Sequence, residues 1–297
     1  MKSRVEGATP LWIACRLLLS ERGDDFFTHR DKALATADPE DIHDLRVASR
    51  RLREGLALFA PCYPPAGIAR LGKNFRRVTR ALGAIRNTDE ALLFFNSLAE
   101  ALGEPCRAEL AQLRGSFGDE REKELKRLRA ILRENAPRSL RRGYLRVVSA
   151  PTLFASGSSA DPFLPLSLFA RDALDAGLAA VLELVSPARR AGEIGAQHRL
   201  RIAIKHFRYR AEILADLFGA GFPELRDRLK GFQDILGRMH DLDVFAGIVR
   251  DVKLAGGTGE TVLNAIATRR EGLFAEFTGM LDTIPPEKIG EQLRSAL

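Results

Sequence analysis

Two stretches of the sequence carry basic side chains at helical spacing, and each forms a row without an opposite charge inside it. The rows are His43, Arg46, Arg50 and Arg53 in HDLRVASRRLR, and His198, Arg201, Lys205 and Arg208 in HRLRIAIKHFRYR. Steps of three and four residues keep each row within an arc of about 80° on a helix. Guanidinium, ammonium and imidazolium groups on one face suit an anion that carries several phosphate groups.

The alternative for any charged helix face is an ordinary solvated surface. Such surfaces usually alternate the two signs at positions i and i+4. Here Arg46 precedes Arg50 by four residues, and the second row repeats this like-charge pair, which costs an isolated helix about 0.2–0.5 kcal/mol. Acidic residues occur only near the ends of the rows, at Glu54 and Glu212. Two rows without neutralising charges favour an anion-binding face.

A third basic row follows the first along the chain and consists of Lys73, Arg76 and Arg80, again three and four residues apart. In the second half Lys230 matches Arg76, whereas Asp227 and Asp234 replace the other two cations. We therefore expect a thinner basic wall from the second half, and a common groove or pore where the two halves face each other.

The rows belong to an internal repeat. The two histidine rows are related by an offset of 155 residues, and LGAIRNTDEALLFF from Leu82 matches LGRMHDLDVFAGIV from Leu236 at an offset of 154. Two motifs at nearly the same offset indicate a duplication. The matched Asp89 and Asp243 have the wrong charge for phosphate. We expect them to accept bonds from a helix end or to orient a basic side chain.

Apolar residues recur three and four positions apart throughout, and no stretch alternates as a half-buried strand does, which predicts an all-α protein. Residues 151–164 are rich in Pro, Ser and Gly and predict a linker. We expect a four-helix bundle on each side of it, in residues 1–150 and 165–297. The expected helices are at about 10–35, 39–60, 68–102, 105–134, 165–186, 193–218, 223–253 and 260–282, with a short one near 286–297.

Composition narrows the class of partner. The chain has 297 residues, of which 45% are hydrophobic, so it can bury a core. Its net charge of +7 is concentrated in residues 1–150, with 28 Lys and Arg against 20 Asp and Glu, compared with 18 against 19 in the remainder. This asymmetry indicates a polyanionic partner: nucleic acid, anionic lipid or an inorganic phosphate polymer.

The cysteines and the apolar segments indicate the compartment. Three cysteines without CxxC spacing argue against a disulfide framework and against a zinc site. The apolar stretch near the N-terminus is short and interrupted by Arg16, and no segment approaches the length needed to cross a bilayer. We expect a soluble cytoplasmic protein without a metal, a cofactor or a membrane partner, and the sequence carries no signal for an oligomeric state.

The chain resembles the CHAD family, named for conserved histidines in an α-helical domain. The motifs that carry the resemblance are the two histidine rows and the LG-x3-N-x-D and LG-x3-D-x-D stretches. The resemblance covers essentially the whole chain. It implies two pseudo-symmetric four-helix bundles around a basic central cavity, and non-catalytic binding of inorganic polyphosphate, often at intracellular polyphosphate granules. The implied binding residues are His43, Arg46, Arg50, Arg53, Lys73, Arg76, Arg80, His198, Arg201, Lys205, Arg208 and Lys230.

Two alternative functions remain open. The dipeptides His43-Asp44 and His240-Asp241 resemble the HD dyad of metal-dependent phosphohydrolases. Such a site needs several converging ligands, and arginines occupy the repeat positions that match Asp44 and His240. RNA binding would use the same cations for phosphate contacts, but base recognition also needs aromatic stacking partners. No aromatic residue is interleaved with the basic rows, which favours polyphosphate.

Overall fold

The chain is almost entirely helical. The computed structural model describes residues 5–36, 38–104, 106–134, 137–154, 160–252, 254–255 and 257–297. Over these residues it contains ten α-helices, two short 3-10 turns and no β-strand, which confirms the predicted all-α class. None of the described helices is long and apolar enough to cross a membrane.

Each half of the chain contains five α-helices. The first half comprises α1 (Leu11–Thr36), α2 (Pro39–Leu58), α3 (Pro65–Leu102), α4 (Cys106–Glu134) and α5 (Pro137–Val148). The second half comprises α6 (Leu166–Ala188), α7 (Ile194–Ile213), α8 (Phe222–Val252), α9 (Thr258–Thr283) and α10 (Pro286–Ser295). The 3-10 turns η1 (Ala60–Cys62) and η2 (Ala215–Leu217) follow α2 and α7.

Helix α5 corrects the prediction of four helices before the linker. It is only 12 residues long, and Gly143 and several arginines obscure its pattern. Its apolar stripe has one residue per turn: Leu140, Tyr144 and Val148 are all buried. The other expected helices are present, and their starts follow the predicted signals. At α2, for example, Asp38 accepts a hydrogen bond from the Glu40 amide at 2.8 Å, and Pro39 occupies the first turn.

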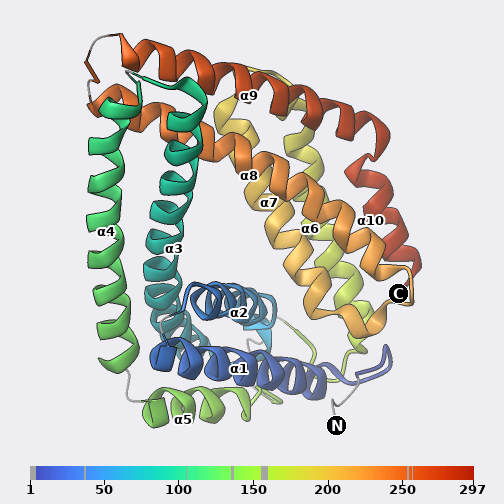
Figure 1. The fold of residues 1–297 in the computed structure, drawn as a ribbon. Helices are drawn as coiled ribbons and strands as arrows, with labels where there is room; N and C mark the ends of the chain where they lie inside the picture. Colours follow the sequence, from blue (N-terminus) through green and yellow to red (C-terminus); the bar gives the residue numbers. More distant parts are fainter. Residues whose placement is uncertain are drawn as a thin grey trace.

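The two halves pack their helices in the same succession. In the first, α1 packs on α2, α2 on α3 and α3 on α4; in the second, α6 packs on α7, α7 on α8 and α8 on α9. The halves meet where α2 contacts α7, and again where Phe94 of α3 stacks on Phe245 of α8 at 4.6 Å. Figure 1 shows the long pairs α3–α4 and α8–α9 meeting at their far ends, away from α1 and α2.

One buried apolar cluster includes residues of both halves. The segment before α1 also runs beside the end of the predicted linker: the Leu11 amide donates to the Leu164 carbonyl, and the Leu166 amide donates to the Thr9 carbonyl, both at 2.9 Å. Of the predicted linker 151–164, residues 155–159 lie outside the described part of the chain, and the rest is not helical. The halves therefore share a core and a backbone contact.

The last helix of each half docks against its first helix at a glycine. Tyr144 of α5 packs on Gly23 of α1 and donates a hydrogen bond to the Leu19 carbonyl. Gly290 of α10 packs in the same way on Leu178 of α6. A Cβ atom at either glycine would overlap the opposing side chain, so these positions are limited to glycine by packing rather than by backbone conformation.

The Gly23 contact gives a stability prediction. Gly23→Ala should lower the free energy of unfolding by about 2 kcal/mol, because the buried Tyr144 ring must move. The matched control is Gly115→Ala in α4, where an added Cβ meets no atom within 4 Å. That change should raise stability by about 0.5–1 kcal/mol through helix propensity alone. Urea unfolding followed by circular dichroism measures both, and equal effects would contradict the docking contact.

Candidate functional site

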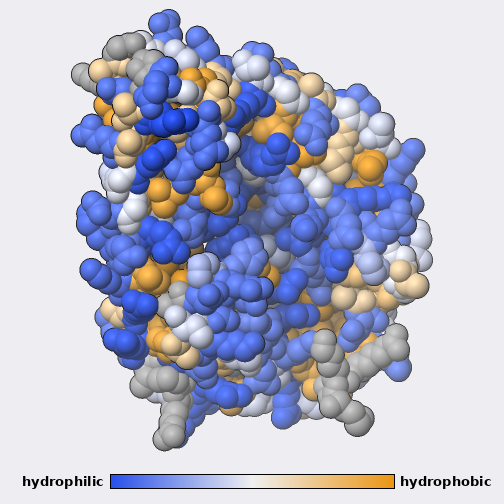
Figure 2. Space-filling model, in the orientation of Figure 1, coloured by the Kyte–Doolittle hydropathy of each residue, from blue (hydrophilic) through white to orange (hydrophobic). Residues whose placement is uncertain are grey.

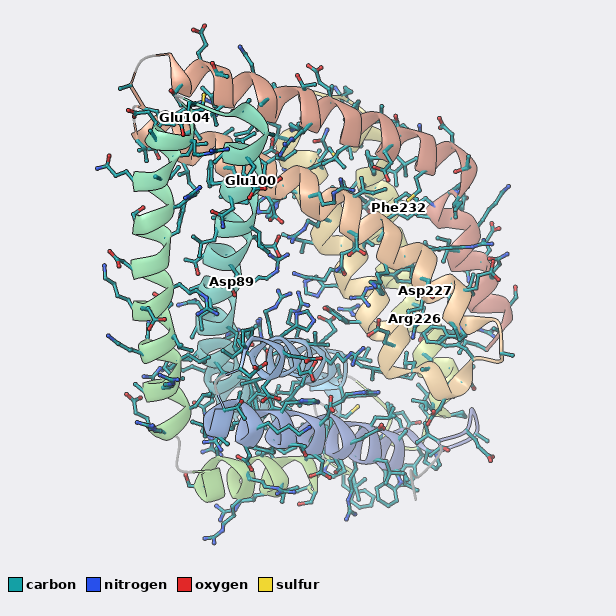
Figure 3. The ribbon with its side chains drawn as sticks, viewed as in Figure 1. Asp89, Glu100, Glu104, Arg226, Asp227 and Phe232 are labelled. Carbon is teal, nitrogen blue, oxygen red and sulfur yellow. The ribbon has the colours of Figure 1, made fainter. Side chains whose placement is uncertain are left out.

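A pocket of about 860 Å³ opens between α2, α3, α7 and α8, and we call it the basic pocket. Figure 2 shows the surface here hollowed and mostly hydrophilic, and Figure 3 shows Asp89 of α3 and Arg226 and Asp227 of α8 on opposite sides of it. Half of the predicted binding residues line it. The basic lining consists of His43, Arg46, Arg50, Arg51, Arg86, Arg201, Arg208, Arg226, Lys230 and Arg238.

Amphipathic helices direct these cations into the pocket. On α2, Leu45 and Leu52 are fully buried on the side opposite the basic row. On α7, Leu200, Ile204 and Phe207 are buried in the same way. Burying these apolar stripes in the common core fixes the rotation of both helices, so the basic row of each faces away from the core.

Three arginines at this site lack a compensating carboxylate. Within the described chain, Arg46, Arg50 and Arg201 make no ion pair within 4 Å, and the Nε atoms of Arg50 and Arg201 are buried without a hydrogen-bond partner. The Arg50 guanidinium lies over the Tyr209 ring, 5.6 Å from its centroid. Buried polar groups are ordinarily hydrogen-bonded, so these atoms are suited to an anionic ligand.

The pKa values show how unfavourable this concentration of charge is. Burial, followed by the charges of Arg50 and Arg86, lowers the pKa of Arg46 to about 10. Burial also lowers the pKa of Arg86, and it lowers that of Lys205, to which Arg201 and Arg50 then add. A lowered pKa in a cation means that the charged form is destabilised, and a bound anion would reverse the effect.

The histidines occupy two different environments. His43 lines the basic pocket, and burial followed by the charge of Arg46 lowers its pKa. His198 does not line that pocket: its ring lies 4.3 Å from that of His240, and burial followed by Arg201 lowers its pKa. Both imidazoles therefore favour the neutral form in the free protein.

Not every predicted residue reaches the basic pocket. Lys73, Arg76 and Arg80 line a second pocket of about 580 Å³ between α3 and α4. Arg53 lies between the two sites, since the charges of Arg76 and Arg80 lower its pKa after burial has done so, and Arg53 in turn acts on Lys205. The structure thus distributes the predicted cations over two pockets, with Arg53 beside the α3–α4 pocket, Lys205 beside the basic pocket, and these two close to each other.

Two further members of the predicted set differ from the rest. Arg208 is ion-paired with Glu212, and its Nε donates to Gln233 at 3.1 Å, so its charge is already compensated. Lys230 shares the basic pocket with Asp227 and Asp234. The second half therefore contributes the weaker wall, as the sequence predicted.

The acidic residues at the row ends join the two halves. Glu54 of α2 accepts a hydrogen bond from Arg210 of α7 at 3.0 Å and is bonded to His206. Glu212 of α7 in turn accepts a bond from Arg51 of α2 at 3.2 Å. Burial opposes ionisation of Glu54, but the bonds from His206 and Arg210 outweigh it and lower the pKa of this carboxyl. The crossing of α2 and α7 is thus held by buried carboxylates.

The repeated aspartates are structural, as predicted. Asp89 accepts a bond from Arg121 Nε of α4 at 2.5 Å, and Asp243 accepts one from Arg270 Nε of α9, also at 2.5 Å. Each therefore ties its own helix to the next helix along the chain and orients an arginine. Both pairs are only partly exposed, so they stabilise more than a surface ion pair does.

The sequence analysis missed several residues at the site. Arg51, Arg86, Arg226 and Arg238 line the basic pocket, Tyr209 lies beneath Arg50, and the His240 ring lies 4.3 Å from that of His198. The alignment of the repeats places Arg86 opposite His240, and this match could have identified both residues. Nothing in the sequence distinguishes Tyr209 in this way, because an aromatic residue on the apolar side of a helix usually belongs to the hydrophobic core.

The HD dipeptides do not assemble a metal site among the described residues. No group of three or more His, Cys, Asp or Glu there could hold a metal ion. Asp44 lies 3.6 Å from His29, while His43 faces the cations of the basic pocket. The three cysteines are buried and free, in agreement with the absence of a predicted disulfide framework.

Removing the charge of Glu54 tests the role of the crossing. Glu54→Gln should lower the free energy of unfolding by about 2 kcal/mol near neutral pH, since it removes a buried carboxylate that accepts bonds from His206 and Arg210. The folded pKa of Glu54 is depressed, so its contribution is present above the unfolded value of 4.5 and is lost as pH falls through the folded pKa. The variant should therefore lose less stability than the wild type on acidification. Glu134→Gln, which removes an exposed partner of Arg77, is the control and should cost under about 1 kcal/mol.

The comparisons with known proteins agree with this architecture. The family model for the CHAD domain matches residues 18–250. Among solved structures, the chain is similar to the crystal structure of the CHAD domain from the plant Ricinus communis, at 22% identity and a TM-score of 0.63, covering 100% of this chain and 96% of that one. It is also similar to PptA from Streptomyces chartreusis, at 17% identity and a TM-score of 0.62, covering 97% and 100%.

At these identities the structural likeness shows the fold alone, and the search of curated proteins found no match. The family assignment instead depends on the family model, which matches well over half of the chain and includes both histidine rows. The protein therefore belongs to the CHAD domain family.

Proposed function

We propose that the protein binds inorganic polyphosphate through the basic pocket and does not transform it. The observation that carries this proposal is the group formed by Arg46, Arg50 and Arg201, which are partly buried and have no carboxylate partner in the described chain, with the Nε atoms of Arg50 and Arg201 buried and unpaired. Such a group is unfavourable in the free protein, and an anion with one charge per repeating unit would relieve it. The resemblance to the CHAD family supports the same ligand.

The two pockets suit an extended ligand better than a single phosphate. Arg53 is influenced by Arg76 and Arg80 of the α3–α4 pocket, Lys205 is influenced by Arg201 and Arg50 of the basic pocket, and Arg53 and Lys205 are close to each other. A chain of phosphates could contact His43 and Arg46 at one end and Arg76 at the other, with basic residues along its whole length. Each contact would release counterions, so the affinity should depend steeply on salt.

The lining of the basic pocket favours polyphosphate over RNA. Its aromatic residue among the described positions is Tyr209, which is 2% exposed and covered by Arg50 and Arg208. A ring in that position cannot stack on successive bases, as single-stranded RNA binding requires. A bare phosphate chain needs no stacking surface. We further propose a cytoplasmic protein that collects on polyphosphate granules.

Neutralising two central arginines tests the site. The Arg46→Gln, Arg50→Gln double variant should weaken binding of long-chain polyphosphate by at least about 100-fold, and should reduce the slope of log affinity against log salt by about two. The matched control is Arg129→Gln with Arg133→Gln, which removes two exposed arginines of α4 outside the basic pocket. Calorimetric titration at two salt concentrations, with circular dichroism to check folding, provides the measurement.

Other outcomes of the same titration would refute the proposal. RNA binding that equals or exceeds polyphosphate binding would assign the pocket to nucleic acid. Metal-dependent release of orthophosphate that is lost in His43→Gln would make the protein a hydrolase. An equal loss of affinity in the α4 control would mean that overall charge, rather than the basic pocket, determines binding.

The histidines predict a pH dependence. The pKa values of His43 and His198 are lowered in the free protein, and a bound polyanion would raise them, so binding should take up protons. Affinity should therefore increase about threefold or more as pH falls from about 8 to about 6. The stability of the free protein changes in the opposite direction. Because the folded histidine pKa lies below the unfolded value of 6.5, the unfolded chain takes up protons first, and the folded state loses stability as pH falls below 6.5. The His43→Gln, His198→Gln variant should flatten the binding profile, and a pH-independent wild type would contradict the prediction.

A further inference from the structure

A third pocket adjoins the basic pocket at the far junction of the two halves. It has a volume of about 540 Å³ and lies between α3, α8 and α9. Glu90, Arg238 and Asp241 line both pockets, so the two share a border. We call it the aromatic pocket, because its remaining lining includes two phenylalanines. None of the predicted binding residues lines it.

The walls of this pocket are flat and apolar. Phe94 stacks on Phe245 with ring centroids 4.6 Å apart and an interplanar angle of 22°, and the Arg269 guanidinium lies 5.5 Å from the Phe94 centroid. Leu93 is 66% exposed, although it is large and apolar. Opposite, an added Cβ on Gly272 of α9 would meet no atom within 4 Å, so α9 leaves room there. Figure 2 shows hydrophobic colour over α8 and α9 beside the upper edge of the hollow.

The rim of the aromatic pocket supplies hydrogen-bond acceptors. Glu276 is 56% exposed, and its nearest cation, Arg238, lies 3.9 Å away, which leaves acceptor capacity on the carboxylate. Glu90 is paired with Arg86, and Asp241 raises the pKa of Arg86 against the effect of burial. The border between the two pockets thus consists of two carboxylates, Glu90 and Asp241, and one arginine, Arg238.

We propose that this chain binds nucleoside 5′-polyphosphates, with the base in the aromatic pocket and the phosphates extending past Arg238 and Arg86 into the basic pocket. The proposal rests on the proposed function of the basic pocket as a phosphate site. A base offers a flat face to the exposed Leu93 and to the Arg269 guanidinium that lies over Phe94, and amino groups to the carboxylates of the rim. Bare polyphosphate has nothing that these groups could bind, so the aromatic pocket needs a different part of a ligand.

The geometry suits one base rather than a nucleic acid. The aromatic pocket holds a stacked pair, Phe94 and Phe245, and it shares Glu90, Arg238 and Asp241 with the basic pocket. A nucleotide with several phosphates places its one base at one end of a run of negative charge. That arrangement matches one apolar pocket joined to one cationic pocket.

The test compares ATP with tripolyphosphate, which carries the same number of phosphates and no base. Calorimetric titration of the full chain, without added metal, should give ATP an affinity about tenfold higher than that of tripolyphosphate. Electrostatics alone gives the opposite order, because tripolyphosphate carries at least as much negative charge. Gly272→Leu places an isobutyl group in the aromatic pocket, where the space is open, and favours the helix. It should reduce the affinity ratio to about one and leave tripolyphosphate binding unchanged.

The matched control is Gly279→Leu on the same helix, where an added Cβ also meets no atom and which lines neither pocket. It should retain the wild-type ratio. Tripolyphosphate that binds as tightly as ATP to the wild type would overturn the base site and leave the phosphate site standing. Failure of both ligands and of long-chain polyphosphate to bind would overturn the proposed function itself. A ratio that Gly272→Leu leaves unchanged would also overturn the base site.

Discussion

The organising constraint of this structure is the repulsion among partly buried cations where α2 crosses α7. Arg46 and Arg50 are held beside Arg201 although burial, followed by neighbouring arginine charges, lowers the pKa of Arg46 and Arg50 and so destabilises their charged forms. The arrangement persists because each helix is fixed from behind by a fully buried apolar stripe, and because Glu54 and Glu212 link the helices just beyond the basic rows. Apolar burial and two carboxylates thus offset an unfavourable site. The same clustered arginines therefore lower the stability of the free protein and favour the binding of an anion.

The repeated pattern explains how one chain can hold such a site steady. In each half, an aspartate of the long central helix binds an arginine of the following helix, and the last helix docks on the first at a glycine. Asp89 lies in the lining of the basic pocket, whereas Asp243 and the two glycines lie outside it. These contacts fix α3 and α8, whose far ends meet through Phe94 and Phe245. The pocket is therefore bordered by elements that are supported at both ends.

The sequence predicted the helices and the facing of the basic rows, because both follow from local periodicity. It predicted the structural role of Asp89 and Asp243 because a repeated residue of the wrong charge for the ligand has to serve the fold. It did not predict α5, whose single apolar residue per turn is too weak a pattern. It could not show that Arg208 is paired with Glu212 while Arg50, on the matching face of α2, is not. Which cation receives a carboxylate depends on the crossing of α2 and α7, which is a tertiary contact.

The same reasoning explains why the aromatic pocket was not visible in the sequence. Phe94 and Phe245 lie at offset positions of the repeat that are apolar in both halves, so each looks like an ordinary core residue. In the structure Phe94 is half-buried and stacks on the buried Phe245 where α3 and α8 meet, and Gly272 of α9 lines the same pocket. The junction between the two halves is basic in one pocket and largely apolar in the next. Glu90, Arg238 and Asp241 lie at the change, where a ligand with a charged part and a flat apolar part would contact both pockets.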